Sequence, residues 1–486
     1  MCAPIVTLPR PTGFPVRSRQ GRRILVATVL GAGIAGIDTS VVNVALPEIG
    51  RDLGASFASL QWTVTGYTLS LASLILLAGG LGDRYGRRRI FLIGVAGFTL
   101  ASVLCAAVPD VLTLVGARIL QGVGGALMAP ASMAILQATI APGDRPVAIG
   151  TWSGFAGIAG ALAPFAGGWL LSLGSWRWIF LINVPVAAVV LVISLRHLPE
   201  TRDEGSSGMD WGGSALAFAS LAAATYALTV LPADPTRPSG LASAVVAVGA
   251  GAGFAWYERR TASPMLPTAV AKSRAFITIN VITFVVYGAF AVFSMVFTIA
   301  LETVAGYSPA EAGSTTVPIT VLSLALSRLS GRLAARIGPG PQLAIGPVLC
   351  GTAALMALRV GPETGYWSVA IPLECVFGLG TAAMVAPLTS VALSSLPGGH
   401  VGVASAVNNT VARTAGLVWV AGLPPLVGLA GDSYTQGGLF LPGYRLACVI
   451  CAAAMFVSGA IAAVAGPRSQ FRLFSPLLLG RQEEAA

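Results

Sequence analysis

Repeated apolar runs of about 20 residues place the strongest constraint on this chain, because that is the length an α-helix needs to cross the hydrocarbon core of a bilayer. Hydrophobic residues make up 55% of the sequence and charged residues only 10%. Soluble proteins carry about 25% charged residues. So few charged side chains cannot cover a water-facing surface. We therefore predict an all-α polytopic membrane protein.

Marking these runs predicts fourteen transmembrane helices. The first run is longer than the core of a signal peptide and no cleavage signal follows it, so we expect it to be retained. The predicted spans are 24–46, 61–82, 90–108, 112–135, 147–171, 179–197, 211–231, 240–257, 276–298, 311–331, 343–360, 367–393, 403–430 and 440–465.

The distribution of Lys and Arg over the loops predicts the orientation. With a cytoplasmic N-terminus, 22 of the 29 basic residues fall on the cytoplasmic side, five fall on the other side, and Arg118 and Arg413 lie inside spans. Basic residues accumulate in cytoplasmic loops. We expect a multi-pass protein of the cell inner membrane with both termini in the cytoplasm. The net charge of +10 then reflects topology and contact with anionic lipid, and not binding to nucleic acid.

Two short sequence matches recur at an offset of 252 residues. Residues 79–86 resemble residues 331–338, and residues 54–58 resemble residues 306–310. Parallel repeats are a known architecture of transporters. We predict two six-helix bundles in parallel pseudo-repeat with two extra helices between them in the sequence. The predicted divisions are the N-tail 1–23, a bundle 24–198, a linker with the extra helices 199–275, a bundle 276–465 and the C-tail 466–486.

Several segments together resemble a known family. The loop GGLGDRYGRRR at 79–89, the stretch RILQGVGGA at 118–126 and the stretch GIAGALAPFAGG at 157–168 are similar to motifs A, B and C of the major facilitator superfamily. The stretches 38–47 and 176–185 resemble those of fourteen-helix drug:proton antiporters of the EmrB/QacA type, which include antibiotic exporters of actinobacteria. The resemblance covers residues 24–465. One departure is Ala163, where motif C usually has Gly.

Two acids lie well inside predicted spans, Asp38 in the first and Glu374 in the twelfth. A charge at bilayer depth is costly, so each is a candidate functional residue. We expect Asp38 to bind and release a proton, as the resemblance also implies, or alternatively to pair with a buried cation such as Arg118. Glu374 is either a second proton or cation site or a carboxylate near the interface that reaches water.

Polar residues in three further spans extend this candidate coupling and substrate site. The resemblance implies that Arg118 takes part in proton transfer, and structural ion pairing is the alternative. Arg413 lies near Asn408 and Asn409, a cluster that either lines a cavity or holds helices together. We add Asn43, which belongs to the same motif as Asp38.

Two other segments are candidates for conformational control. The resemblance implies a cytoplasmic gate around Asp83, and simple positive-inside anchoring is the alternative; the gate residues are Asp83, Arg84, Gly86, Arg87 and Arg88. The antiporter motif in the fifth span implies close packing and a kink at the interface of the two bundles, with ordinary small-residue packing as the alternative. Its candidates are Gly157, Gly160, Pro164, Gly167 and Gly168.

These features predict a secondary transporter, and not an enzyme. We expect export of small drug-like or antibiotic molecules in exchange for protons, with proton-coupled uptake as the first alternative and a membrane-embedded sensor or enzyme as a remote one. The expected substrate is amphipathic or cationic, because two acids lie within the membrane. We expect no metal and no cofactor, the proton gradient as the energy source, and a monomer in the lipid bilayer.

Overall fold

The computed structural model describes residues 13–172, 174–202, 210–232, 234–261, 273–395, 401–429 and 436–465. The predicted C-tail, residues 203–209 of the predicted linker and the first twelve residues of the N-tail lie outside these ranges. Within them the fold is helical, and the only β pairing is an isolated bridge between Phe14 and Ile140.

The helices follow the predicted spans closely. In the N-terminal part they are α1 (Arg19–Leu53), α2 (Phe57–Tyr85), α3 (Arg87–Ala107), α4 (Val111–Thr139), η1 (Pro142–Asp144), α5 (Arg145–Leu171), α6 (Trp178–Leu181), α7 (Asn183–His197), α8 (Trp211–Val230) and α9 (Pro238–Glu258). In the C-terminal part they are α11 (Arg274–Thr303), α12 (Pro309–Ser314), α13 (Val317–Ile337), α14 (Gly340–Met356), η2 (Ala357–Arg359), η3 (Tyr366–Ala370), α15 (Ile371–Ser394), α16 (Val401–Leu426) and α17 (Gly437–Ala465).

Each predicted span coincides with one helix or with adjoining short helices, as span 179–197 does with α6 and α7. By length and hydropathy, nine helices among the described residues can cross a membrane, or eleven if α1 and α2, each bent by more than 40°, count as one span each. These findings support a polytopic all-helical membrane protein, and the number of fourteen spans stays a prediction.

Short polar residues set several helix ends. The Ser18 hydroxyl accepts a hydrogen bond from the backbone N–H of Gly21 at 2.9 Å, and Asp110 accepts from Thr113 at 2.9 Å at the start of α4. Such caps satisfy backbone donors that have no partner within the helix. At the other end of α1, Gly54 adopts the left-handed conformation with φ 59°, which costs glycine little. The connection between α1 and α2 is therefore a tight turn.

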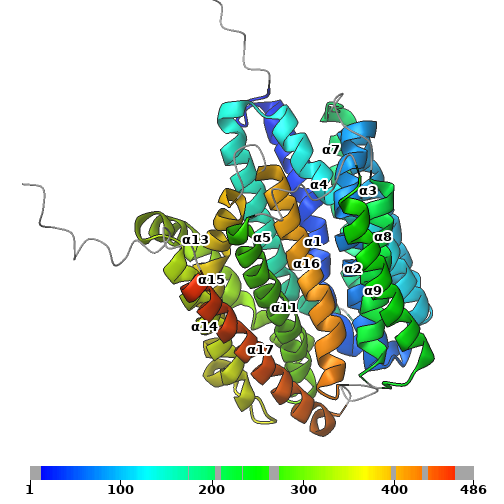
Figure 1. Cartoon of the computed structure of the whole chain (residues 1–486), viewed down its shortest axis with the longest axis vertical. Helices are drawn as coiled ribbons and strands as arrows, with labels where there is room; N and C mark the ends of the chain where they lie inside the picture. The colour runs from blue at the N-terminus through cyan, green and yellow to red at the C-terminus, as the bar shows by residue number, and fades with distance from the viewer. Residues whose placement is uncertain are drawn as a thin grey trace, which may run out of the picture.

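Helices from the two ends of the sequence pack into one bundle (Figure 1). Close contacts join α1 to α4, α5 and α7, and α2 to α4, while α11 packs on α16 and α17, and α15 on α13 and α14. The extra pair is central in the sequence but lies at the edge of the bundle (Figure 1). There α8 contacts both α2 and α16, and α9 packs on α8 with Gly240 as its only buried residue.

At one end, the two parts of the chain pack tightly against each other. The apolar core there includes Leu46 and Phe57 from α1 and α2 together with Ile299 and Leu301 from α11. Helix α5 contacts α12 and α13, and α1 contacts α11. This end carries the connections α1–α2 and α11–α12, and it is closed by apolar packing.

Candidate functional site

Asp38 and Arg118 form a buried ion pair between α1 and α4. The Asp38 side chain is fully buried, and that of Arg118 is 1% exposed. Arg118 Nη1 contacts Asp38 Oδ2, and Arg118 Nε donates to the backbone oxygen of Thr63 at 3.1 Å. Pairing removes much of the penalty for burying either charge alone. Functional roles are predicted from the sequence for both residues, and this pairing is the alternative given there for each.

Two amide side chains complete the polar shell around Asp38. Gln121 Nε2 donates to Asp38 Oδ1 at 2.8 Å, and Asn183 Nδ2 donates to the same oxygen at 3.2 Å. Both amides also reach the hydroxyl of Ser102, at 2.8 and 3.2 Å. Gln121 Oε1 accepts from Arg118 Nη1 at 2.6 Å, so α1, α3, α4 and α7 meet at one network.

Aromatic rings flank the guanidinium of this network. The Arg118 Cζ lies 4.3 Å from the centroid of the Tyr67 ring and 5.7 Å from that of Phe180. The ring faces attract a cation electrostatically. Sequence reasoning missed Ser102, Tyr67, Gln121 and Asn183 as site residues. Gln121 lies in the stretch 118–126 and Asn183 in the stretch 176–185, both of which resemble segments of the family. Their positions in these stretches could have marked them as candidates, although their residue types did not.

Glu374 lies at the start of α15 and is 2% exposed, which disagrees with the alternative that it is a carboxylate reaching interfacial water. Its Oε2 atom has no hydrogen-bond partner, and no cation pairs with it among the described residues. It belongs to the core of the C-terminal part and does not join the Asp38 network. A role in proton binding stays a prediction.

The predicted cluster on α16 divides between two directions. Asn408 donates to Asn280 Oδ1 at 3.1 Å and to Thr283 Oγ1 at 2.9 Å, both on α11, so it ties two helices together. Arg413 Nε instead donates to Asn409 Oδ1 at 3.1 Å, one turn away. Asn408 therefore holds helices together, whereas Arg413 lines the cavity described next.

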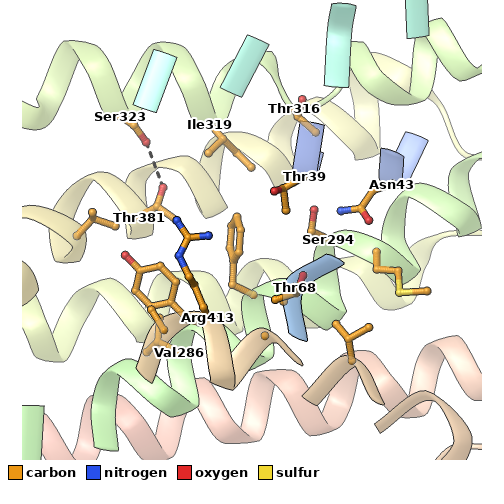
Figure 2. Close-up of a pocket in the computed structure, with 18 of the residues that line it drawn as sticks. Thr39, Asn43, Thr68, Val286, Ser294, Thr316, Ile319, Ser323, Thr381 and Arg413 are labelled. Carbon is orange, nitrogen blue, oxygen red and sulfur yellow. Dashed lines mark hydrogen bonds between the residues drawn. The ribbon is translucent and has the colours of Figure 1, made fainter. Parts of the chain in front are cut away.

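A cavity of about 1080 Å³ lies between the two parts of the chain, lined by α1, α2, α11, α13, α15 and α16. Figure 2 shows Arg413 and Asn43 on different sides of it, with Thr39 and Ser294 between them in this view. The cavity reaches Leu393, in the last turn of α15. Its wall combines many apolar residues with hydroxyls, which suits a drug-sized amphipathic molecule.

Charge is sparse on this cavity wall. Arg413 is the only charged residue among the described residues that line it, and neither Asp38 nor Glu374 belongs to the lining. Asn43 does, and its Oδ1 is buried without a hydrogen-bond partner. Neither carboxylate lines the cavity, so the structure does not support the preference for a cationic substrate that was predicted from two intramembrane acids.

The predicted gate residues connect α2 and α3 to the end of α7. Arg87 contacts Asp83, four residues earlier, at 2.7 Å in a half-buried ion pair. Arg88 donates to the backbone oxygens of Leu195 at 2.6 Å and Ser194 at 3.2 Å. Arg84 instead lies over the ring of its neighbour Tyr85, 5.6 Å from its centroid. Asp83 and Arg88 thus have different partners, and Arg88 fixes this loop to α7.

Glu200 is a partner in this loop that sequence reasoning missed. Its Oε1 accepts from the backbone N–H of Arg88 at 3.0 Å, at the start of α3, where the helix dipole favours an anion. Gly86 has φ 108°, and a Cβ there would lie 2.7 Å from the Glu200 carboxylate. Gly86 is therefore needed both for its backbone conformation and for this close approach.

The antiporter-motif helix α5 makes two close approaches. A Cβ on Gly167 would lie 3.0 Å from Val41 Cγ1 on α1, and one on Gly168 would lie 2.5 Å from the backbone oxygen of Pro309 at α12. The second contact joins the two parts of the chain at the closed end. The other predicted motif residues, Gly157, Gly160 and Pro164, lie on α5, but their side-chain surroundings are outside the described part.

The helical bundle around a central cavity is compatible with a membrane transporter, and the chain belongs to the Major Facilitator Superfamily, which matches residues 28–420. It is therefore a transporter and not an enzyme. It is similar to the tetracenomycin C resistance and export protein of Streptomyces glaucescens, with 33% identity over 90% of this chain and 82% of that protein. The puromycin resistance protein pur8 of Streptomyces alboniger is 34% identical over 82% of this chain and 80% of its own.

Solved structures agree on the fold. The crystal structure of peptide transporter POT in complex with sulfate superposes with a TM-score of 0.67 and 16% identity, covering 94% of this chain and 97% of that one. At this identity the likeness shows the fold alone. The predicted relationship to drug exporters of this superfamily is confirmed by the relatives.

Proposed function

We propose that this protein exports drug-like or antibiotic molecules in exchange for protons by alternating access. The observation that carries the proposal is the buried Asp38–Arg118 pair, held by Gln121 and Asn183 beside the central cavity. The named roles of the relatives, resistance and export, support export over proton-coupled uptake. Uptake on the same fold is the alternative that the experiment below distinguishes.

Protonation of Asp38 is the proposed coupling step. A proton on the carboxylate would neutralise one partner of the pair and leave Arg118 as a buried charge without compensation, which is strongly unfavourable. A second arrangement of the helices, in which Arg118 finds another partner or water, would then gain population. A proton can shift this equilibrium only by its different affinity for the two arrangements.

The two arrangements would differ in the packing of bundle 24–198 against bundle 276–465, with 199–275 as an accessory segment. Helices α2 and α12 start at residues 57 and 309, which are 252 residues apart. This separation equals the offset of the two sequence matches, so α2 and α12 are equivalent in the proposed repeat. In the proposed orientation, with both termini on the cytoplasmic side of the inner membrane, the closed end faces outward. The cavity near Leu393 would then receive substrate from the cytoplasm.

A resistance panel in a pump-deficient bacterium tests this function. We expect the chain to confer resistance to one or more antibiotics or dyes, and Asp38→Asn to abolish it. Asp52→Asn is the matched control, because Asp52 lies on the same helix but forms an exposed pair with Arg177. Everted membrane vesicles should accumulate the same compound only while a proton gradient is present.

Three results would change the proposal. Accumulation that persists after a protonophore dissipates the gradient would exclude proton coupling. Greater sensitivity of expressing cells, with compound entering them, would establish uptake. Resistance that survives Asp38→Asn but not Glu374→Gln would keep export and assign coupling to Glu374.

A further inference from the structure

The wall of the central cavity has a single kind of charge. Among the described residues that line it, Arg413 is the only charged one. The sequence places acids inside these lining helices at few positions, and the two deepest, Asp38 and Glu374, are 1% and 2% exposed and lie outside the lining. A cation in this cavity would therefore meet a positive charge and no carboxylate.

Arg413 is only partly satisfied by the protein. Its Nε donates to Asn409 Oδ1 at 3.1 Å, and no salt bridge to it exists within the described part of the chain. A guanidinium has five N–H donors in a rigid planar fork, so the two terminal nitrogens retain donors suited to a carboxylate or another planar oxygen anion. Arg413 lines the cavity, and Figure 2 shows its guanidinium on the same side as Thr381 in this view.

A second polar side chain lies on the cavity wall, across from Arg413 in Figure 2. Asn43 belongs to the lining, but its Oδ1 atom is covered by the protein and does not open onto the cavity. The charge of Arg413 therefore identifies the class of ligand by itself.

We propose that the transported molecule carries an anionic oxygen group, a carboxylate or an ionised phenol or enol, which pairs with Arg413. An apolar body on the same molecule would fill the rest of the cavity, whose lining is mostly apolar side chains and hydroxyls. This inference rests on the proposed transport function and specifies its substrate class. It replaces the preference for cations that the intramembrane acids alone suggested.

Direct binding to purified protein in lipid nanodiscs tests the inference without requiring transport. Fluorescein and rhodamine 6G share a xanthene body of similar size but are an anion and a cation at neutral pH. Fluorescence anisotropy should show tighter binding of fluorescein. Arg413→Gln should weaken it by about 10-fold to 100-fold, the loss typical of a hydrogen bond to a charged group, and Arg413→Lys should weaken it less.

Charge reversal guards against misfolding of the variants. Arg413→Glu should lose fluorescein and gain rhodamine 6G, a gain that an unfolded protein cannot show, while Arg177→Gln, which is remote from the cavity, should bind as the parent does. Rhodamine 6G binding as well as fluorescein, or fluorescein binding that is absent or unchanged by Arg413→Gln, would overturn the inference. Export of cations alone in the resistance panel would also overturn it while leaving the proposed function intact, and absence of any export would instead contradict the function.

Discussion

Gln121 donates to Asp38 from 2.8 Å and at the same time accepts from Arg118 at 2.6 Å, so one amide contacts both members of the buried ion pair. Its Nε2 also reaches Ser102 at 2.8 Å. Because α4 carries both Arg118 and Gln121 one turn apart, this helix presents a preformed site to the carboxylate on α1. The network is thus a joint between helices as well as a candidate proton site.

Gln121→Met keeps the approximate volume of this side chain and removes its polar atoms. We expect a loss of about 1–3 kcal/mol in the free energy of unfolding, because buried groups of Asp38, Arg118 and Ser102 lose a partner. Denaturant titration of the purified protein measures it. Thr352→Ala, which removes an exposed hydroxyl bonded only within α14, should change stability by less than about 0.5 kcal/mol. Equal effects of the two variants would contradict the network.

The Asp38–Arg118 pair should show strong coupling in a double-mutant cycle. Asp38→Asn and Arg118→Gln should each destabilise the protein by about 3–5 kcal/mol, because each leaves an opposite charge buried alone. The double variant contains no buried charge, so it should lose clearly less than the two single losses added together. Unfolding titrations of the four proteins give the coupling free energy. Simple additivity would show that the pair does not interact as described.

Gly86→Ala should destabilise the loop between α2 and α3 by about 1–3 kcal/mol, since alanine at φ 108° is strained and its Cβ would meet Glu200. Gly97→Ala is the matched control, because no atom lies within 4 Å of the added Cβ and the residue is helical. That control should be neutral or stabilising by up to about 1 kcal/mol. Thermal unfolding of both variants measures these effects. Combining Gly86→Ala with Glu200→Ala removes the clash between the added Cβ and the Glu200 carboxylate but keeps the backbone strain at residue 86, so the combined variant separates the two causes.

Gly168→Val should weaken the closed end of the transporter. Its side chain would occupy the space of the Pro309 backbone oxygen, which lies 2.5 Å from the position of a Cβ. We expect a membrane-impermeant maleimide to label Thr298→Cys in the cavity faster from outside intact cells when Gly168→Val is present. Gly116→Val on α4, where no atom lies within 4 Å of an added Cβ, should leave labelling unchanged. Unchanged labelling in both would show that the α5–α12 contact does not hold this end closed.

Much of the fold could be predicted from the sequence because lipid allows few solutions. Backbone polar groups in hydrocarbon must bond within their own segment, so each long apolar run has to be a helix. Ser and Gly then place ends such as Ser18 and Gly54. The charges inside spans could be recognised in the same way, because Asp38, Arg118, Glu374 and Arg413 are conspicuous against an apolar background.

The apolar runs and the positions of the charges thus predict which segments are helices and which charged residues lie within them. What each of these residues faces depends on how the helices pack in the folded protein. Neighbouring helical residues point about 100° apart. Asp38 therefore turns to Arg118 while Thr39 lines the cavity, and Asn408 turns to α11 while Asn409 holds Arg413. Lipid tails are as apolar as the side chains of these spans, so hydrophobicity does not set the rotation of such helices. Packing between helices distant in sequence sets it instead.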